Sequence, residues 1–142
     1  MREEFEMISI IASGKGTGKT KRVIKLANED VIKEKGNVVF VDDDKRHMYD
    51  LKHDLRFISM DEYPVKTKDC FIGFLCGIIS NDYDIGKIYI DGLLKVMDTS
   101  LGEMPDFVDK VEKLSNKYDI DFVMTISCGK DRLDEKMHKF LI

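Results

Sequence analysis

A glycine- and lysine-rich octapeptide, SGKGTGKT at residues 13–20, constrains the fold of this chain more than any other stretch. It follows an apolar run at residues 7–12 and precedes a helical repeat of apolar residues that starts at Val23. A strand, a glycine-rich turn and a helix N-terminus in this order form an anion site, because loop N–H groups and the helix dipole both favour negative charge. Glycine is required where the backbone takes unusual dihedral angles close to a phosphate chain. The sequence therefore predicts a phosphate-binding loop.

The octapeptide resembles the Walker A loop of P-loop NTPases, G-x-x-x-x-G-K-[ST], although Ser13 replaces the first glycine. The resemblance implies that Lys19 reaches the β- and γ-phosphates of ATP or GTP, where it has a catalytic role, and that Thr20 ligates Mg²⁺. The residues that the resemblance assigns to nucleotide binding are Ser13, Gly14, Lys15, Gly16, Thr17, Gly18, Lys19, Thr20 and Lys21. A dinucleotide fingerprint is disfavoured, because it needs glycine where this chain has Lys19.

Apolar segments typical of buried strands alternate with helical repeats along the rest of the chain. This alternation predicts an α/β fold with a parallel sheet of about five strands, formed by one domain over residues 1–142. The family resemblance implies the three-layer sandwich of P-loop NTPases. We expect the strands at residues 7–12, 37–41, 56–60, 87–91 and 121–127, with the short third strand at an edge. Thr67 or Asp69 is expected to cap the helix before the fourth strand, and Asp131 or Asp134 to start a last helix.

Residues 88–91, IYID, resemble the Walker B element of the same superfamily. The resemblance implies that Asp91 hydrogen-bonds a water on the Mg²⁺ that Thr20 holds. A different interpretation also fits these residues, since Asp91-Gly92 between two apolar runs is typical of a type I′ hairpin turn. The order of the predicted elements favours the Walker B interpretation.

RecA-like and AAA-type ATPases insert a strand between the Walker A and Walker B strands, and residues 121–127 correspond to that strand. By resemblance, Thr125 or Ser127 is then the sensor of the γ-phosphate. The glutamate that often follows the Walker B acid is replaced by Gly92. RecA-like and DnaB-like members carry their base after the second strand instead, where this chain has the three acids Asp42, Asp43 and Asp44. One of these acids orients the attacking water, or the three form a solvated strand end.

The patterns VFVDDD at residues 39–44 and IYIDG at residues 88–92 also resemble small bacterial ATP-binding proteins, loosely labelled PilT-like. The predicted function is Mg²⁺-dependent binding of ATP or GTP with slow hydrolysis. The alternative is a nucleotide-binding switch or degenerate module without turnover, which the missing glutamate favours. A small-molecule kinase is a weaker alternative, because no flexible insertion supplies the arginines of a lid.

Composition restricts the partners and the compartment. A net charge of −4 argues against a general nucleic-acid binder. A protein partner and a homo-oligomer are both compatible with the sequence. His47 and His53 lie six residues apart, a poor spacing for zinc on a helix. The basic stretch at residues 45–56 suits an exposed helix, or a contact with a substrate phosphate.

The chain is expected to be cytoplasmic. Its first six residues are too acidic for a targeting peptide, and its longest apolar run, residues 71–80, is about half a membrane span. Three cysteines without a C-x-x-C pair predict free, mostly buried thiols in a reducing compartment.

Overall fold

The computed structural model describes residues 7–34 and 36–142, and it has an α/β architecture with a five-stranded, all-parallel sheet. The predictions of fold class and of parallel pairing are confirmed. The strand order is β1-β5-β4-β2-β3, so the last strand in the sequence lies between β1 and β4, as predicted. The strands are β1 (Ile8–Ser13), β2 (Asn37–Asp42), β3 (Arg56–Ser59), β4 (Ile85–Ile90) and β5 (Asp121–Ser127).

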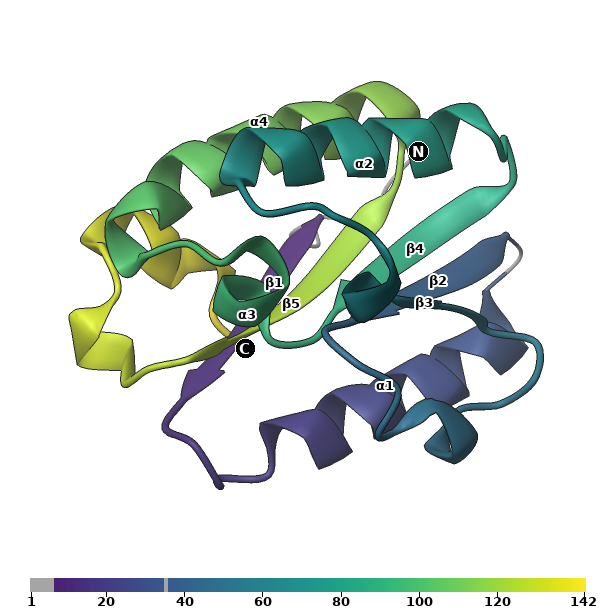
Figure 1. The fold of residues 1–142 in the computed structure, drawn as a ribbon, viewed down its shortest axis with the longest axis horizontal. Helices are drawn as coiled ribbons and strands as arrows, with labels where there is room; N and C mark the ends of the chain where they lie inside the picture. Colours follow the sequence, from purple (N-terminus) through teal and green to yellow (C-terminus); the bar gives the residue numbers. More distant parts are fainter. Residues whose placement is uncertain (1–6, 35) are drawn as a thin grey trace.

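Helices cover both faces of the sheet (Figure 1). Helix α1 (Lys19–Lys33) lies against one face, and α2 (Lys68–Ser80) and α4 (Met104–Tyr118) lie against the other. The short helix α3 (Leu93–Met97) follows β4. The two faces of the sheet contribute to two separate hydrophobic clusters. Along β2, for example, alternate residues pack with α1 on one face and with α2 and α4 on the other. This two-sided burial explains why the strands have continuous apolar runs.

Helix α1, which the loop precedes, is fixed to the sheet by polar contacts as well as by packing. The buried hydroxyl of Tyr89 on β4 donates a hydrogen bond to Asp30 of α1. Lys87 on the same strand pairs with the Asp30 carboxylate, with an Nζ–Oδ2 distance of 2.6 Å. These contacts hold the helix that carries Lys19 and Thr20 against the strand that leads to Asp91.

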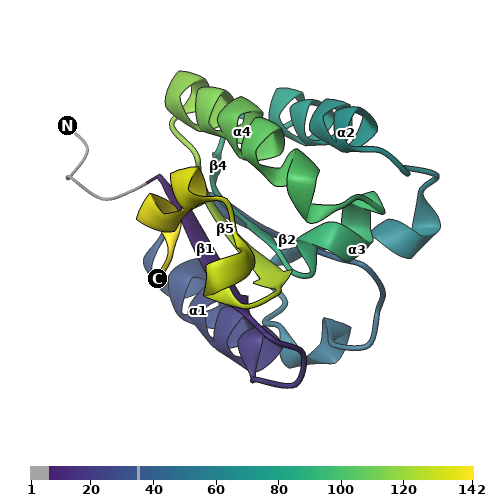
Figure 2. The ribbon, with the colours of Figure 1, turned by 90° about the vertical axis from the view of Figure 1, so that its left-hand side faces the viewer.

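Helices α2 and α4 lie side by side on the opposite face (Figure 2). Thr67 caps α2 as predicted, because its Oγ1 accepts a hydrogen bond from the Cys70 amide at 3.1 Å. Lys68 of α2 pairs with Asp106 of α4 at 2.5 Å, and Lys110 of α4 pairs with Asp69 of α2 at 3.1 Å. Each pair has at least one exposed carboxylate, so water weakens the attraction and the apolar packing beneath contributes most of the stabilisation.

Four sequence-based expectations are wrong. The hairpin alternative at Asp91 is excluded, because β4 pairs in parallel with both neighbours and is followed by α3. Cys70 and Cys76 are exposed, and of the three cysteines Cys128 alone is buried. Instead of helices, residues 45–54 contain the 3₁₀ turn η1 (Met48–Asp50), and the C-terminal segment forms η4 (Lys130–Arg132) and η5 (Glu135–Phe140).

The remaining 3₁₀ turns are η2 (Met60–Glu62) and η3 (Leu101–Glu103). After η5 the chain returns to the sheet, where Leu141 bridges Ile10 of β1 in parallel. Within the described part of the chain, no helix combines the length and apolar character that a membrane crossing requires. The acidic start of the sequence, on which the prediction of compartment rests in part, lies outside the described residues.

Candidate functional site

The glycine-rich loop connects the end of β1 to the start of α1. Gly16 and Gly18 have φ angles of 76° and 88°, a left-handed conformation that side chains with a Cβ rarely adopt. Thr17 Oγ1 donates to the Gly14 carbonyl at 2.7 Å, so Ser13 Oγ is the donor in its 2.5 Å contact with Thr17 Oγ1. Ser13, the departure from the Walker A pattern, therefore forms a hydrogen bond across the loop that glycine cannot form.

Lys19 is the first residue of α1 and is buried, with 9% of its surface exposed. Its Nζ donates to the Gly14 carbonyl at 3.0 Å. An ammonium has three N–H donors, so this bond leaves donors for an anion over the loop. A buried cation is costly unless it is paired, which makes this position suited to a negatively charged ligand.

Asp91 lies at the carboxyl end of β4, and both of its carboxylate oxygens accept hydrogen bonds. Thr20 Oγ1 donates to Oδ2 at 3.0 Å, and Thr125 Oγ1 donates to Oδ1 at 2.6 Å. The Gly92 amide in turn donates to Thr125 Oγ1 at 2.7 Å. The structure thus brings together the loop threonine, the predicted Walker B acid and one predicted sensor. Thr125 is bound to Asp91 and Gly92, whereas Ser127 is exposed at the edge of the same cavity.

Asp42, at the end of β2, is buried with 2% of its surface exposed. Its Oδ1 accepts a hydrogen bond from the Asp43 amide at 2.8 Å, but its buried Oδ2 has no hydrogen-bond partner among the described residues. Burial, with further contributions from the side chain of Asp43 and the charge of Asp91, raises the pKa of Asp42 to about 8. The environment of Asp42 therefore favours the neutral form of its carboxyl group.

The other two acids after β2 differ from Asp42. Asp43 is partly buried and faces the same cavity, whereas Asp44 is not part of its lining. The Arg46 amide and guanidinium donate to the Asp44 carboxylate, and these contacts hold the pKa of Asp44 below its usual value. Asp44 therefore stabilises the turn after β2, and Asp42 and Asp43 are the acids placed at the site.

Two cavities adjoin the loop. The polar one, with a volume of about 350 Å³, brings the loop together with the acids at the ends of β2 and β4. The other, of about 500 Å³, lies beside α1 and includes the apolar Ile24 and the predicted Lys21. Both are lined by Gly16, Lys19, Thr20 and His47. The polar cavity and the less polar cavity thus share lining residues at the start of α1.

Four ionisable lining residues were not assigned to the site from the sequence: Arg46, His47, Asp50 and Lys95. The first two belong to the basic stretch for which a phosphate contact was only one alternative. His47 Nδ1 lies 3.3 Å from Asp50 Oδ2. Lys95 lies three residues after Gly92, about one helical turn beyond the predicted Walker B acid. This spacing is the sequence signal from which Lys95 could have been assigned to the site.

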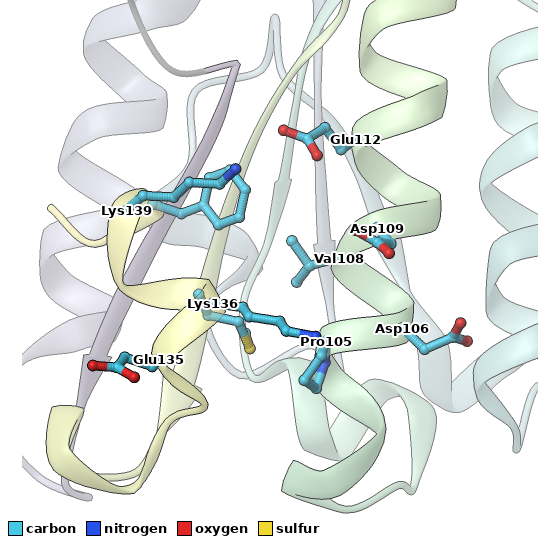
Figure 3. A pocket seen from close by; sticks show the side chains of 10 residues that line it. Pro105, Asp106, Val108, Asp109, Glu112, Glu135, Lys136 and Lys139 are labelled. Atoms are coloured by element: carbon cyan, nitrogen blue, oxygen red, sulfur yellow. The ribbon is translucent and has the colours of Figure 1, made fainter.

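A further cavity, of about 600 Å³, lies elsewhere, between α4 and η5 (Figure 3). None of the predicted site residues lines it. Its charged lining consists of four acids and two lysines, which does not suit a phosphate: Asp106, Asp109, Glu112, Glu135, Lys136 and Lys139.

No protein-family model matches the chain, and a search of curated proteins finds no match either. Interpretation of the site therefore rests on its residues and their geometry.

Proposed function

We propose that this protein binds ATP or GTP together with Mg²⁺ in a three-layer P-loop NTPase fold of the RecA-like type, and that it hydrolyses the nucleotide slowly. One observation carries the proposal: Thr20, at the end of the glycine-rich loop, donates a hydrogen bond to Asp91, 71 residues away. Walker A and Walker B assignments require this meeting of loop and acid. The position of β5 between β1 and β4 supports the RecA-like branch.

The triphosphate would lie over the loop, where backbone amides, the buried Lys19 and the start of α1 all favour negative charge. The polar cavity continues from there toward Asp91 and Asp42. The adjoining cavity beside Ile24 and His47 offers space for the ribose and base. Lys19 would stabilise the charge that develops on the γ-phosphate during hydrolysis.

The residues at the site fit Mg²⁺. This ion is held in such sites by one or two carboxylates and by substrate phosphates, and it keeps several waters. Thr20 and Asp91 supply oxygens side by side, and the same cavity is lined by Asp42, whose buried Oδ2 has no hydrogen-bond partner among the described residues. The described residues contain no group of three or more histidine, cysteine or acidic side chains arranged to hold a metal ion, so substrate phosphates would complete the coordination. When bound, the ion neutralises charge on the phosphates.

Slow hydrolysis follows from the acids available. Gly92 leaves no carboxylate directly after Asp91, so Asp42 or Asp43 would orient the attacking water. A nucleotide-binding switch without turnover is the second candidate, and the raised pKa of Asp42 favours it, because a protonated carboxyl group accepts no proton. We further propose a cytoplasmic location, and a protein partner or second copy of the chain stays a prediction.

The test is nucleotide binding by the purified protein, first by mass analysis of co-purifying nucleotide and then by titration with Mg²⁺-ATP and Mg²⁺-GTP. We expect Lys19→Ala to weaken binding at least about 100-fold, because it removes the buried phosphate contact. Lys113→Ala, which changes an exposed lysine on α4, is the matched control and should bind as the wild type does. Full affinity in Lys19→Ala would refute the proposal.

Phosphate release separates the two candidates. Turnover that persists in Lys113→Ala and disappears in Lys19→Ala supports the NTPase. Tight binding without phosphate release, alone or with cell extract added, supports the switch.

A further inference from the structure

One cation that lines the polar cavity lies outside the glycine-rich loop and is not paired with a described residue, and the proposed function does not yet use it. Four basic side chains with fixed charge line it: Lys15, Lys19, Arg46 and Lys95. Lys15 and Lys19 belong to the loop and to the start of α1. Arg46 is already paired, since its Nε lies 2.9 Å from Asp44 Oδ2. Lys95 comes from a separate element, α3, and its ammonium forms no ion pair or hydrogen bond with any described residue.

The Lys95 side chain starts close to Gly92. A Cβ added to Gly92 would lie 3.9 Å from both Cβ and Cδ of Lys95, so the methylene chain of the lysine lies beside the position that a side chain at residue 92 would occupy. The Lys95 amide also donates to the Gly92 carbonyl at 2.9 Å. Gly92 follows Asp91 directly, and its amide is hydrogen-bonded to Thr125. The base of the lysine side chain therefore rests on a part of the site that is firmly held.

Gly92 itself allows this placement. Its φ of 76° is a left-handed conformation, which lets the chain turn from β4 into α3. The turn brings the first exposed residue of α3, Lys95, back to the mouth of the cavity that Asp91 lines. The position that is acidic in many P-loop enzymes is thus occupied by a glycine, and Lys95 lines the same cavity.

We propose that Lys95 is a cation, supplied by the same chain, that contacts the terminal phosphate of the bound nucleoside triphosphate and distinguishes it from a diphosphate. This inference rests on the proposed function. Lysine suits such a role, because its flexible chain allows a charged hydrogen bond to form when the anion arrives. On this proposal a diphosphate, which lacks the terminal phosphate, makes no contact with Lys95.

The experiment compares two affinities in each variant: that for a non-hydrolysable β,γ-imido triphosphate and that for the matching diphosphate, both with Mg²⁺. In Lys95→Gln we expect the triphosphate Kd to rise about tenfold, the effect of losing one charge-assisted contact, while the diphosphate Kd changes less than about twofold. Lys95→Arg should restore most of the triphosphate affinity. Lys113→Gln, on α4 away from the cavity, should leave both values unchanged.

Each contrary outcome identifies what has failed. A wild-type protein that binds both nucleotides, with a Lys95→Gln variant that loses neither affinity or both equally, overturns the role of Lys95 and leaves the proposed function intact. A wild-type protein that binds neither nucleotide overturns the proposed function and this inference together. Because Lys95 is exposed, the unfolding midpoint of Lys95→Gln should match that of Lys113→Gln.

Discussion

The neighbouring strands β2 and β4 both lead to a buried aspartate, and the two carboxylates are held in opposite ways. Asp91, after β4, accepts a hydroxyl hydrogen bond at each oxygen, from Thr20 and from Thr125. Asp42, at the end of β2, has one oxygen bonded to the Asp43 amide and one buried oxygen with no partner among the described residues. The site thus combines a rigid acceptor with a carboxyl group whose charge depends on what binds nearby.

Strand neighbours explain the difference. Asp91 has β5 on one side, which presents Thr125, and the start of α1 nearby, which presents Thr20. Asp42 pairs in register with Ser59 of β3, a buried residue that also carries a hydroxyl. That hydroxyl donates to Asp61 instead. Asp42 therefore receives no hydroxyl from its edge-strand neighbour, and the negative charge of Asp91 further disfavours its ionisation.

Replacing the rigid carboxylate should have the largest effect on stability. We expect Asp91→Ala to lower the free energy of unfolding by about 3 kcal/mol, because two hydroxyl hydrogen bonds to a charged group are lost. Urea denaturation measures this change. The matched Asp42→Ala variant should lose clearly less, because it removes one amide bond and relieves an unfavourable burial. Equal losses in the two variants would contradict the contrast between the sites.

Asp42→Asn tests the raised pKa of Asp42 through the pH dependence of the free energy of unfolding. The folded-state pKa of Asp42, about 8, lies above its unfolded value near 4, so the folded protein retains a proton that the unfolded chain releases. This contribution to stability is fully present below pH 4 and is lost as the pH rises to 8. Between pH 5 and pH 7, the wild type should lose about 2 kcal/mol relative to Asp42→Asn, which does not titrate there.

Urea denaturation of both proteins at pH 5, 6 and 7 gives this difference directly, because other titrating groups cancel between them. Parallel pH profiles would show that the Asp42 carboxyl group has an ordinary pKa.

The smallest expected effect comes from removing one of the two hydroxyl groups that donate to Asp91. One oxygen of Asp91 then lacks a donor, as one oxygen of Asp42 does. Thr125→Val keeps the shape of the buried side chain but removes the donor to Asp91 Oδ1 and the acceptor for the Gly92 amide. We expect a loss of about 1 to 2 kcal/mol in stability, and faster hydrogen exchange at the Gly92 amide. Unchanged exchange at Gly92 would show that Thr125 does not hold this turn.

Much of the fold was predictable, because buried strands and amphipathic helices leave local patterns. Apolar runs located all five strands to within about two residues, and Thr67 was a predicted cap of α2. The segments whose structure was predicted wrongly are short, and residues distant in the sequence fix their conformation. Residues 48–52 are held by Asn28 of α1, which bonds the Asp50 carbonyl and the Lys52 amide, and this contact leaves no trace in the local sequence.

The sequence by itself determined that a glycine-rich loop joins β1 to α1, because the glycines and the flanking apolar patterns lie within a short stretch of chain. It also predicted that Asp91, Asp42 and Asp43 lie near that loop, since parallel strands end at one edge of a sheet. Only the tertiary structure decided which oxygen atoms are bonded. Thr125 donates a hydrogen bond to Asp91, Ser59 donates to Asp61 instead of Asp42, and Lys95 lines the same cavity as Asp91. Such pairings depend on strand order and register, which bring distant residues to within a few ångströms.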